Sequence, residues 1–172
     1  MVDISIVIPT YRRPKRLHRT LLSLNEQETE FTYEVIIVDD GSAAELTGIV
    51  ESISPRFPYQ ILWQQNRGSR PGAARNLGVN LATGKIILFL DDDVIGDADL
   101  IQEHGLRHTS QDNLVLIGQR HSIPYSYWVN CPEAPLEWLR QHVTMQDPRT
   151  VAFRQESWLK TPWAFLATCH VS

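Results

Sequence analysis

Residues 85–93 read KIILFLDDD, an apolar run that ends in three consecutive aspartates. A short apolar run of this kind, closed by polar residues, is typical of a strand buried on both faces of a parallel sheet. Two earlier stretches have the same build, with ISIVIPT at 4–10 and VIIVDDGS at 35–42. The strands predicted within these three stretches are residues 4–8, 35–38 and 85–90. The repeated pattern predicts a parallel sheet in which polar residues follow each strand.

Predicted helices separate these strands. Pro14 favours a helix start, and the leucines after it recur at helical spacing. Residues 43–53 and 71–82 predict two more helices, and residues 59–63 predict a strand between them. Strands that alternate with helices need crossover connections, so we expect an α/β fold with a mostly parallel sheet and helices on both faces. Ligands bind beyond the carboxyl ends of the strands in such sheets.

The regular alternation ends after about Gly118. Beyond it prolines recur, and four of the five tryptophans are found there: Trp128, Trp138, Trp158 and Trp163. We expect residues 1–118 to form the part that contains the sheet. Residues 119–172 are expected to form a loop-rich C-terminal flap over the sheet edge, with one short helix near residues 135–142. Tryptophans in such a segment pack in a core or a lid more often than they stack on a ligand.

The composition is that of an ordinary globular protein, with 172 residues of which 42% are hydrophobic and 21% charged. A net charge of −4 argues against a dedicated nucleic-acid-binding protein, which normally carries a basic excess. No apolar run reaches the roughly 18 residues of a membrane span. Cys131 and Cys169 are expected to be ordinary thiols in a reducing compartment. We therefore expect a cytoplasmic protein, and a peripheral contact at the inner face of the membrane stays open.

The acidic triplet after the last strand is the strongest local signal for chemistry. A compact cluster of carboxylates suits Mg²⁺ or Mn²⁺, and Asp91 and Asp93 would share a face if the strand geometry continued. One alternative is an acidic cap on the helix that follows. Another is a phosphatase, because an apolar strand followed by D-x-D-V resembles the nucleophile motif of the haloacid-dehalogenase type.

Three further elements carry polar groups. Residues 39–42 are either a plain turn or a place where a carboxylate accepts the imide N–H of uracil or an amino group of another base. Arg75, near the start of a predicted helix, could meet a diphosphate or could be solvated. The basic residues of the run 12–16 are expected to form a solvated face rather than a phosphate clamp.

Four stretches together resemble the inverting family 2 glycosyltransferases, which have the GT-A fold. They are ISIVIPTYRR, YEVIIVDDGS, NRGSRPGAARNLGVNLATG and KIILFLDDD, in this order, within residues 4–99. The resemblance implies transfer of a sugar from a nucleotide-diphosphate donor, with UDP as the expected nucleotide, helped by Mn²⁺ or Mg²⁺. It leaves the acceptor open among glycans, lipids and proteins.

The resemblance also implies roles for single residues. Asp40 falls on the carboxylate that contacts the base, Arg75 lies beside the nucleoside and phosphates, and Asp93 holds the metal. Asp91 faces the ribose or the donor sugar and shares the metal. The implied nucleotide-sugar site consists of Pro9, Thr10, Tyr11, Asp40, Arg75, Asp91 and Asp92, of which the first three line the nucleoside pocket.

No residue is implied as the general base. The family places acids after a strand that resembles residues 166–172, where this sequence stops. The late acids of the chain are Glu133, Glu137, Asp147 and Glu156, and their context singles out none of them. We expect a fragment of a longer enzyme with its base outside this chain; the alternative is a nucleotide-sugar-binding fragment without turnover.

Overall fold

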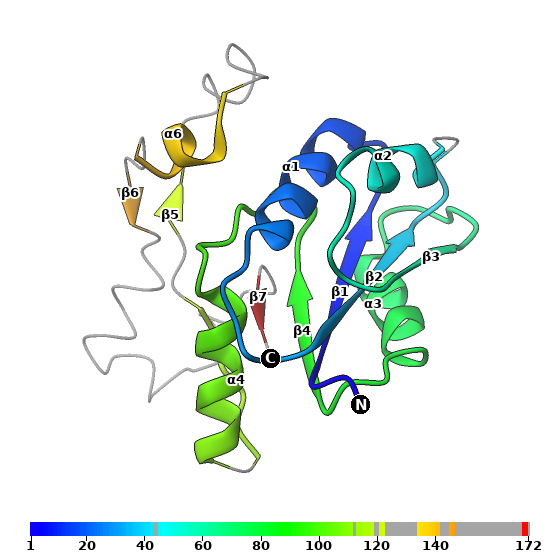
Figure 1. The fold of residues 1–172 in the computed structure, drawn as a ribbon. Helices are drawn as coiled ribbons and strands as arrows, with labels where there is room; N and C mark the ends of the chain where they lie inside the picture. The colour runs from blue at the N-terminus through cyan, green and yellow to red at the C-terminus, as the bar shows by residue number, and fades with distance from the viewer. Residues whose placement is uncertain are drawn as a thin grey trace. The chain divides into compact units, whose positions relative to one another are not determined.

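Five strands of the described residues form one sheet (Figure 1). The computed structural model describes residues 1–42, 45–111, 113–118, 121–122, 134–141, 145–146 and 170–171. The strand order is β3-β2-β1-β4-β7; the first four are parallel, and β7 pairs with β4 in antiparallel fashion. The strands are β1 (Ile4–Thr10), β2 (Tyr33–Asp39), β3 (Tyr59–Trp63), β4 (Ile86–Leu90) and β7 (His170–Val171). The predicted α/β class with a mostly parallel sheet is confirmed.

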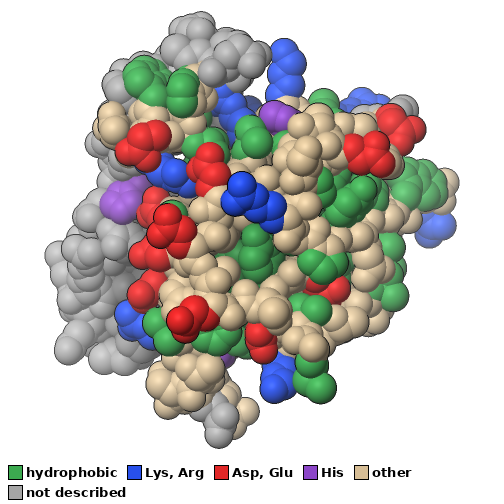
Figure 2. Space-filling view, in the orientation of Figure 1, with side chains coloured by type: hydrophobic (Ala, Val, Ile, Leu, Met, Phe, Trp, Pro, Cys, Tyr) green, Lys and Arg blue, Asp and Glu red, His purple; other side chains and the backbone are tan. Residues whose placement is uncertain are grey.

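Helices cover both faces of this sheet. In Figure 1, α1 and α2 lie on one side of the sheet and α3 on the other. The helices are α1 (Pro14–Asn25), α2 (Thr47–Ser52), α3 (Pro71–Val79) and α4 (Leu100–Ser110). Acidic and basic side chains lie close together on the face drawn in Figure 2.

The alternation of side chains along β1 builds the two halves of the core. Ile4, Ile6 and Ile8 are fully buried on one face, in the cluster that also contains the leucines of α1 and Ile101 of α4. Val7 points to the opposite face and packs with Ala74 of α3. Since both faces of β1 are covered, most of its residues are apolar, as the sequence pattern indicated, and its buried polar side chains, Ser5 and Thr10, are hydrogen-bonded.

One glycine allows α3 to approach the sheet closely. A Cβ at Gly78 would lie 2.4 Å from Cγ1 of Val7, which is far inside van der Waals contact. The side chain of α3 at this position therefore has to be a hydrogen atom. The close packing fixes α3, and with it Arg75, against β1.

Two predicted helices are shorter in the structure. α2 begins at Thr47 rather than near residue 43, because Ser42 is held in the turn after β2 and Leu46 already packs into the core. α3 ends at Val79, and two turn hydrogen bonds, from the N–H groups of Leu81 and Ala82, lead the chain towards β4.

A buried carboxylate ties the sheet together at the end opposite the acidic triplet. Glu34 Oε1 accepts hydrogen bonds from Ser5 Oγ at 2.6 Å and from the backbone N and the Oγ1 of Thr83 at 2.8 and 2.7 Å. Burial raises the pKa of the Glu34 carboxyl, but these bonds outweigh burial and hold the pKa below its usual value. This network links β1, β2 and the turn that precedes β4.

The chain divides into two compact units, residues 1–116 with 168–172 and residues 117–167. The described part of the second unit contains a strand pair, β5 (His121–Ser122) with β6 (Met145–Gln146), and the helix α6 (Leu136–Gln141), which falls within the predicted helix. The expected loop-rich flap otherwise lies outside the described residues, as do Cys131 and Cys169. Among the residues that the structure describes, no helix is long and apolar enough to cross a membrane.

Candidate functional site

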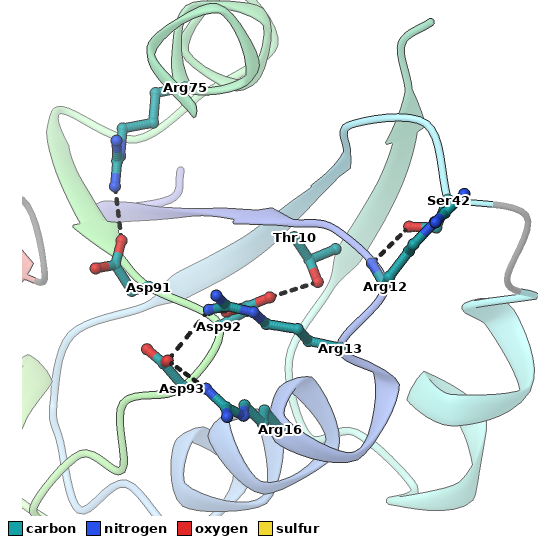
Figure 3. A network of polar contacts seen from close by, with 9 residues as sticks. All are labelled: Thr10, Arg12, Arg13, Arg16, Ser42, Arg75, Asp91, Asp92 and Asp93. Carbon is teal, nitrogen blue, oxygen red and sulfur yellow. Dashed lines mark hydrogen bonds and ion pairs between the residues drawn. The ribbon is translucent and has the colours of Figure 1, made fainter. Parts of the chain in front are cut away.

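The acidic triplet lies in a turn beyond the end of β4. This strand ends at Leu90, and the N–H of Val94 donates to the backbone oxygen of Asp91 at 3.4 Å. Because the strand does not continue, its alternation does not apply: Asp91 turns to Arg75, whereas Asp92 and Asp93 share Arg13 (Figure 3). The alternative of a helix cap is wrong, because α4 begins only at Leu100 and Asp99 takes its N-cap position.

Asp92 is the buried member of the triplet, with 4% of its surface exposed. Its Oδ2 accepts a hydrogen bond from Thr10 Oγ1 at 2.7 Å, and its Oδ1 lies 3.3 Å from Arg13 Nη1. Burial raises the pKa of the Asp92 carboxyl, and the charge of Asp93 adds to this, although Thr10 and Arg13 act in the opposite direction. Asp92 therefore links the ends of β1 and β4.

Asp93 is engaged by two arginines on the same oxygen. Arg13 Nη1 lies 3.2 Å and Arg16 Nη1 3.1 Å from Asp93 Oδ2 (Figure 3). The Asp93 side chain keeps about a third of its surface exposed, at 34%. Arg13 and Arg16 keep 51% and 35% of their side chains exposed, as expected for a solvated face, and they also form ion pairs with the triplet that the sequence did not predict. Their position directly after a predicted strand was the signal that could have revealed these ion pairs.

Asp91 pairs with an arginine from the other side of the sheet. Arg75 Nη2 of α3 lies 2.6 Å from Asp91 Oδ1, and only 12% of the Arg75 side chain is exposed. Arg75 is therefore not a solvated helix arginine, which was the alternative to a phosphate contact, because its guanidinium is largely covered and paired. Since α1 and α3 cover opposite faces, the arginines that hold Asp93 and Asp91 approach the triplet from both faces.

The turn after β2 is built by Asp39 and Ser42. The backbone N–H of Ser42 donates to Asp39 Oδ1 at 2.9 Å, its hydroxyl bonds the same oxygen, and the backbone N–H of Arg12 donates to Ser42 Oγ at 3.0 Å. Gly41 has φ +87°, and a Cβ there would lie 2.5 Å from the backbone nitrogen of Asn66. The plain-turn interpretation therefore holds for Asp39 and Ser42.

Asp40 belongs to a different set of contacts. Gln64 Nε2 donates to Asp40 Oδ1 at 2.6 Å, and the backbone N–H of Arg70 donates to Oδ2 at 3.3 Å. Asn66 Nδ2 donates to the backbone oxygen of Asp40 at 2.8 Å. The loop between β3 and α3 thus holds Asp40 at three points. Sequence reasoning missed Gln64, although its place directly after a predicted strand marks it as another strand-end polar residue.

The remaining predicted site residues lie at the end of β1. Pro9 is half-buried in the strand opposite Val38, and Thr10 is buried. Tyr11 is exposed, and the guanidinium carbon of Arg12 lies 5.0 Å from the centre of its ring. Arg12 has φ +54°, a conformation that non-glycine residues adopt rarely and that occurs preferentially at functional sites.

The donor set fits a hard divalent cation shared with a substrate. Asp91 and Asp93 both present partly exposed carboxylate oxygens at the same strand end. The described residues bring together no group of three His, Cys, Asp or Glu side chains that could hold a metal on its own. Mg²⁺ commonly takes only one or two carboxylates, and substrate phosphates and waters complete its shell. The residues present are therefore compatible with a metal that binds together with a phosphate ligand.

These carboxylates and arginines gather at the carboxyl ends of β1, β2 and β4, the edge at which parallel α/β sheets bind their ligands. The chain belongs to glycosyl transferase family 2, whose model matches residues 5–153. It is 36% identical over 125 residues to the "Uncharacterized glycosyltransferase YfnE" of Bacillus subtilis (strain 168), over 72% of this chain and 31% of that protein. It is 37% identical over 123 residues to the chondroitin synthase of Escherichia coli, over 72% of this chain and 18% of that protein.

A solved structure supports the same conclusion. The crystal structure of S. aureus TarS 1-349 in complex with UDP-GlcNAc matches 67% of this chain and 34% of the TarS chain, with a TM-score of 0.60 and 26% identity. The expected family and the expected GT-A fold are confirmed. The chain spans about a third or less of the length of these relatives. With the family shown, the phosphatase hypothesis is set aside.

Proposed function

We propose that this chain carries the donor-binding part of a metal-dependent glycosyltransferase. The enzyme transfers a sugar from a UDP-sugar to an acceptor hydroxyl with inversion at the anomeric carbon. The observation that carries the proposal is the convergence of Thr10, Asp40 and the triplet 91–93 at the carboxyl ends of β1, β2 and β4, with Arg75 beside them. Ligands of parallel α/β sheets bind at this edge.

The proposed nucleoside contacts come from β1 and β2. Asp40 accepts a hydrogen bond from the base, and Pro9, Thr10 and Tyr11 line the nucleoside. The exposed ring of Tyr11 and the buried carboxylate of Asp40 suit these roles, because a base offers an apolar face and polar edges. The TarS structure is a complex with UDP-GlcNAc, and this supports uracil as the base.

The proposed phosphate and metal contacts come from β4 and α3. Asp93 and Asp91 would hold Mn²⁺ or Mg²⁺ together with the donor diphosphate. Asp92 would position these two residues through its own bonds to Thr10 and Arg13. Arg75 would lie beside the phosphates. When bound, the metal supplies Lewis-acid stabilisation of the negative charge on the leaving diphosphate. The Arg75 guanidinium adds fixed positive charge at the same place.

The transfer itself makes one bond and breaks another. The acceptor oxygen bonds to the anomeric carbon on the face opposite the diphosphate, the bond from that carbon to the diphosphate oxygen breaks, and the hydroxyl proton passes to a carboxylate base. We assign no residue of this chain as that base. Glu137 lies in α6 of the second unit, and Glu133, Asp147 and Glu156 lie outside the described residues.

We propose that residues 1–118 bind the donor and that residues 119–172 begin the acceptor side. The second candidate is a nucleotide-sugar-binding module without turnover. It is favoured because every proposed donor contact lies between Pro9 and Asp93, whereas no residue of this chain is assigned as the base. Release of free sugar or of glycosylated acceptor from UDP-GlcNAc separates the two candidates. Transfer supports the first, and binding without release supports the second.

Binding of nucleotides to the chain tests the proposal directly. We expect UDP at 100 times its dissociation constant to raise the melting temperature by about 5–10 °C, because a ligand that binds only the native state stabilises it by about 2.7 kcal/mol at that concentration. The increase should be larger with Mn²⁺ present, and smaller with ADP or GDP. A melting temperature that no nucleotide or nucleotide sugar changes would contradict the proposal.

A further inference from the structure

The carboxylate of Asp40 is held unequally on its two oxygens. Oδ1 accepts from Gln64 Nε2 at 2.6 Å, a short bond within a partly buried pair. Among the described residues, the donor to Oδ2 is the backbone N–H of Arg70, at 3.3 Å, which is beyond the usual range for such a bond. An ionised carboxylate has about four acceptor positions, two on each oxygen. Gln64 therefore engages one oxygen strongly, and the other oxygen remains the better acceptor for a further donor.

The orientation of the Gln64 amide follows from the chemistry of its partner. A carboxylate only accepts hydrogen bonds, so the amide has to turn its NH₂ group toward Asp40. Gln64 comes directly after β3, and the backbone N–H of Gln64 donates to the backbone oxygen of Asp39 at 2.9 Å. This bond continues the pairing of β3 with β2 and fixes the Gln64 backbone beside Asp40.

Nucleobases differ in the number of donors that they offer to a carboxylate. The edge of uracil carries one imide N–H between two carbonyl oxygens. The edge of guanine carries two adjacent donors, the N1–H and the N2 amino group, and these pair with both oxygens of a free carboxylate at once. Gln64 takes one of the two acceptor positions of Asp40 Oδ1, so a second bond from guanine to that oxygen has to compete with the Gln64 amide. The single bond from uracil to Oδ2 meets no such competition.

We propose that Gln64 is a specificity-determining residue, which selects uracil over guanine by engaging Asp40 Oδ1 and presenting Oδ2 as a single acceptor. Gln64 acts through Asp40 and is a positioning residue. The inference rests on the proposed function, in which Asp40 contacts the base. Removal of the Gln64 donor frees Oδ1, so guanine gains its second bond and uracil loses an oriented partner.

The test compares three variants of the 172-residue chain by calorimetry with UDP and with GDP, each with Mg²⁺. Gln64→Met keeps the length of the side chain and removes its donor. Gln64→Lys restores an N–H donor. Gln65→Met is the matched control on the next residue, whose exposed side chain faces Arg67 at 3.4 Å rather than Asp40. The two nucleotides share the diphosphate, so metal and phosphate contacts cancel in the ratio of their dissociation constants.

We expect the parent chain and the Gln65→Met variant to prefer UDP over GDP by the same ratio. That ratio should fall about tenfold in Gln64→Met, the size of one charge-assisted hydrogen bond at the low end. In Gln64→Lys most of the preference should return. A general loss of structure would lower both affinities together and leave the ratio unchanged.

The other outcomes of this experiment contradict either the role of Gln64 or the proposed function. A parent chain that prefers UDP, with an unchanged ratio in Gln64→Met, would overturn the role of Gln64 and leave the proposed function intact. A parent chain that prefers GDP would also overturn the inference while it supports nucleotide binding. A parent chain that binds neither nucleotide would overturn the proposed function, and the inference with it.

Discussion

The hydroxyl of Thr10 donates a hydrogen bond to Asp92 Oδ2 at 2.7 Å, although the two residues lie 82 positions apart in the sequence. The bond joins the ends of β1 and β4, and the register of these strands, with Ile4 opposite Ile86, brings the two residues level with each other. Because Asp92 is the middle residue of the triplet, this bond also fixes the backbone from which the side chains of Asp91 and Asp93 extend. The position of the proposed metal ligands thus depends on a buried contact between two central strands.

We expect Thr10→Val to destabilise the protein by about 1–3 kcal/mol, because it removes the hydroxyl donor from the buried Asp92 carboxylate without a change in side-chain shape. Denaturant unfolding measures the change. Thr109→Val on the exposed end of α4 is the control, since the Thr109 hydroxyl bonds only the backbone oxygen of Leu106. Equal stability of the two variants would show that the link between β1 and β4 contributes little.

We expect Asp93→Ala to abolish the effect of Mn²⁺ on UDP binding and to leave the fold intact. The carboxylate is a proposed metal ligand, and its ion pairs with Arg13 and Arg16 are partly exposed, so their loss should cost less than about 1 kcal/mol. Calorimetry with UDP, with and without Mn²⁺, measures the effect. Asp99→Ala, at the start of α4, should behave like the parent. An Asp93→Ala variant with the parent's Mn²⁺ dependence would refute the metal assignment.

We expect Asp40→Asn to weaken UDP binding by about 1.5–3 kcal/mol and to reduce the preference for uracil. The amide replaces one acceptor oxygen by an NH₂ donor, which would face either Gln64, the N–H of Arg70 or the imide N–H of the base. Calorimetry with UDP, CDP and GDP gives the ranking of the bases. The exposed Glu45→Gln, near the same turn, is the charge-matched control. If affinity and ranking stay unchanged, Asp40 serves only the turn.

We expect the stability contribution of Glu34 to depend on pH. Its pKa in the folded protein lies below the ordinary value of 4.5, so the unfolded chain takes up the proton first as the pH falls. The contribution is therefore fully present above pH 4.5 and is lost as the pH falls through the folded pKa. Glu34→Gln should lower stability by about 1.5–3 kcal/mol at pH 7 and by progressively less as the pH falls below 4.5.

Urea unfolding of the parent and of Glu34→Gln between pH 3 and pH 7 measures this difference. Glu28→Gln is the control, because Glu28 is exposed and the structure pairs only its backbone N–H, with the backbone oxygen of Ala98. A difference between Glu34→Gln and the parent that stays constant over this pH range would contradict the prediction.

The fold class and the sheet edge that carries the candidate site can both be read from the sequence. The strands predicted at 4–8, 35–38, 59–63 and 85–90 agree with β1 to β4 to within two residues at each end. Buried parallel strands require continuous apolar runs, and this requirement is local, so it can be read from the residues alone. The polar residues after each run then had to meet at one edge, because parallel strands end together.

The tertiary structure alone decided which polar side chains meet. Gln64 reaches Asp40 across 24 positions of sequence, and Arg13 reaches Asp92 across 79. Such pairs depend on strand register, on where a strand stops and on the approach of a helix, and none of these leaves a periodic pattern. The end of β4 at Leu90 is the clearest case. If the strand had continued, its alternation would have placed Asp91 and Asp93 on one face. Instead, Asp91 pairs with Arg75, Asp92 with Thr10 and Asp93 with Arg16.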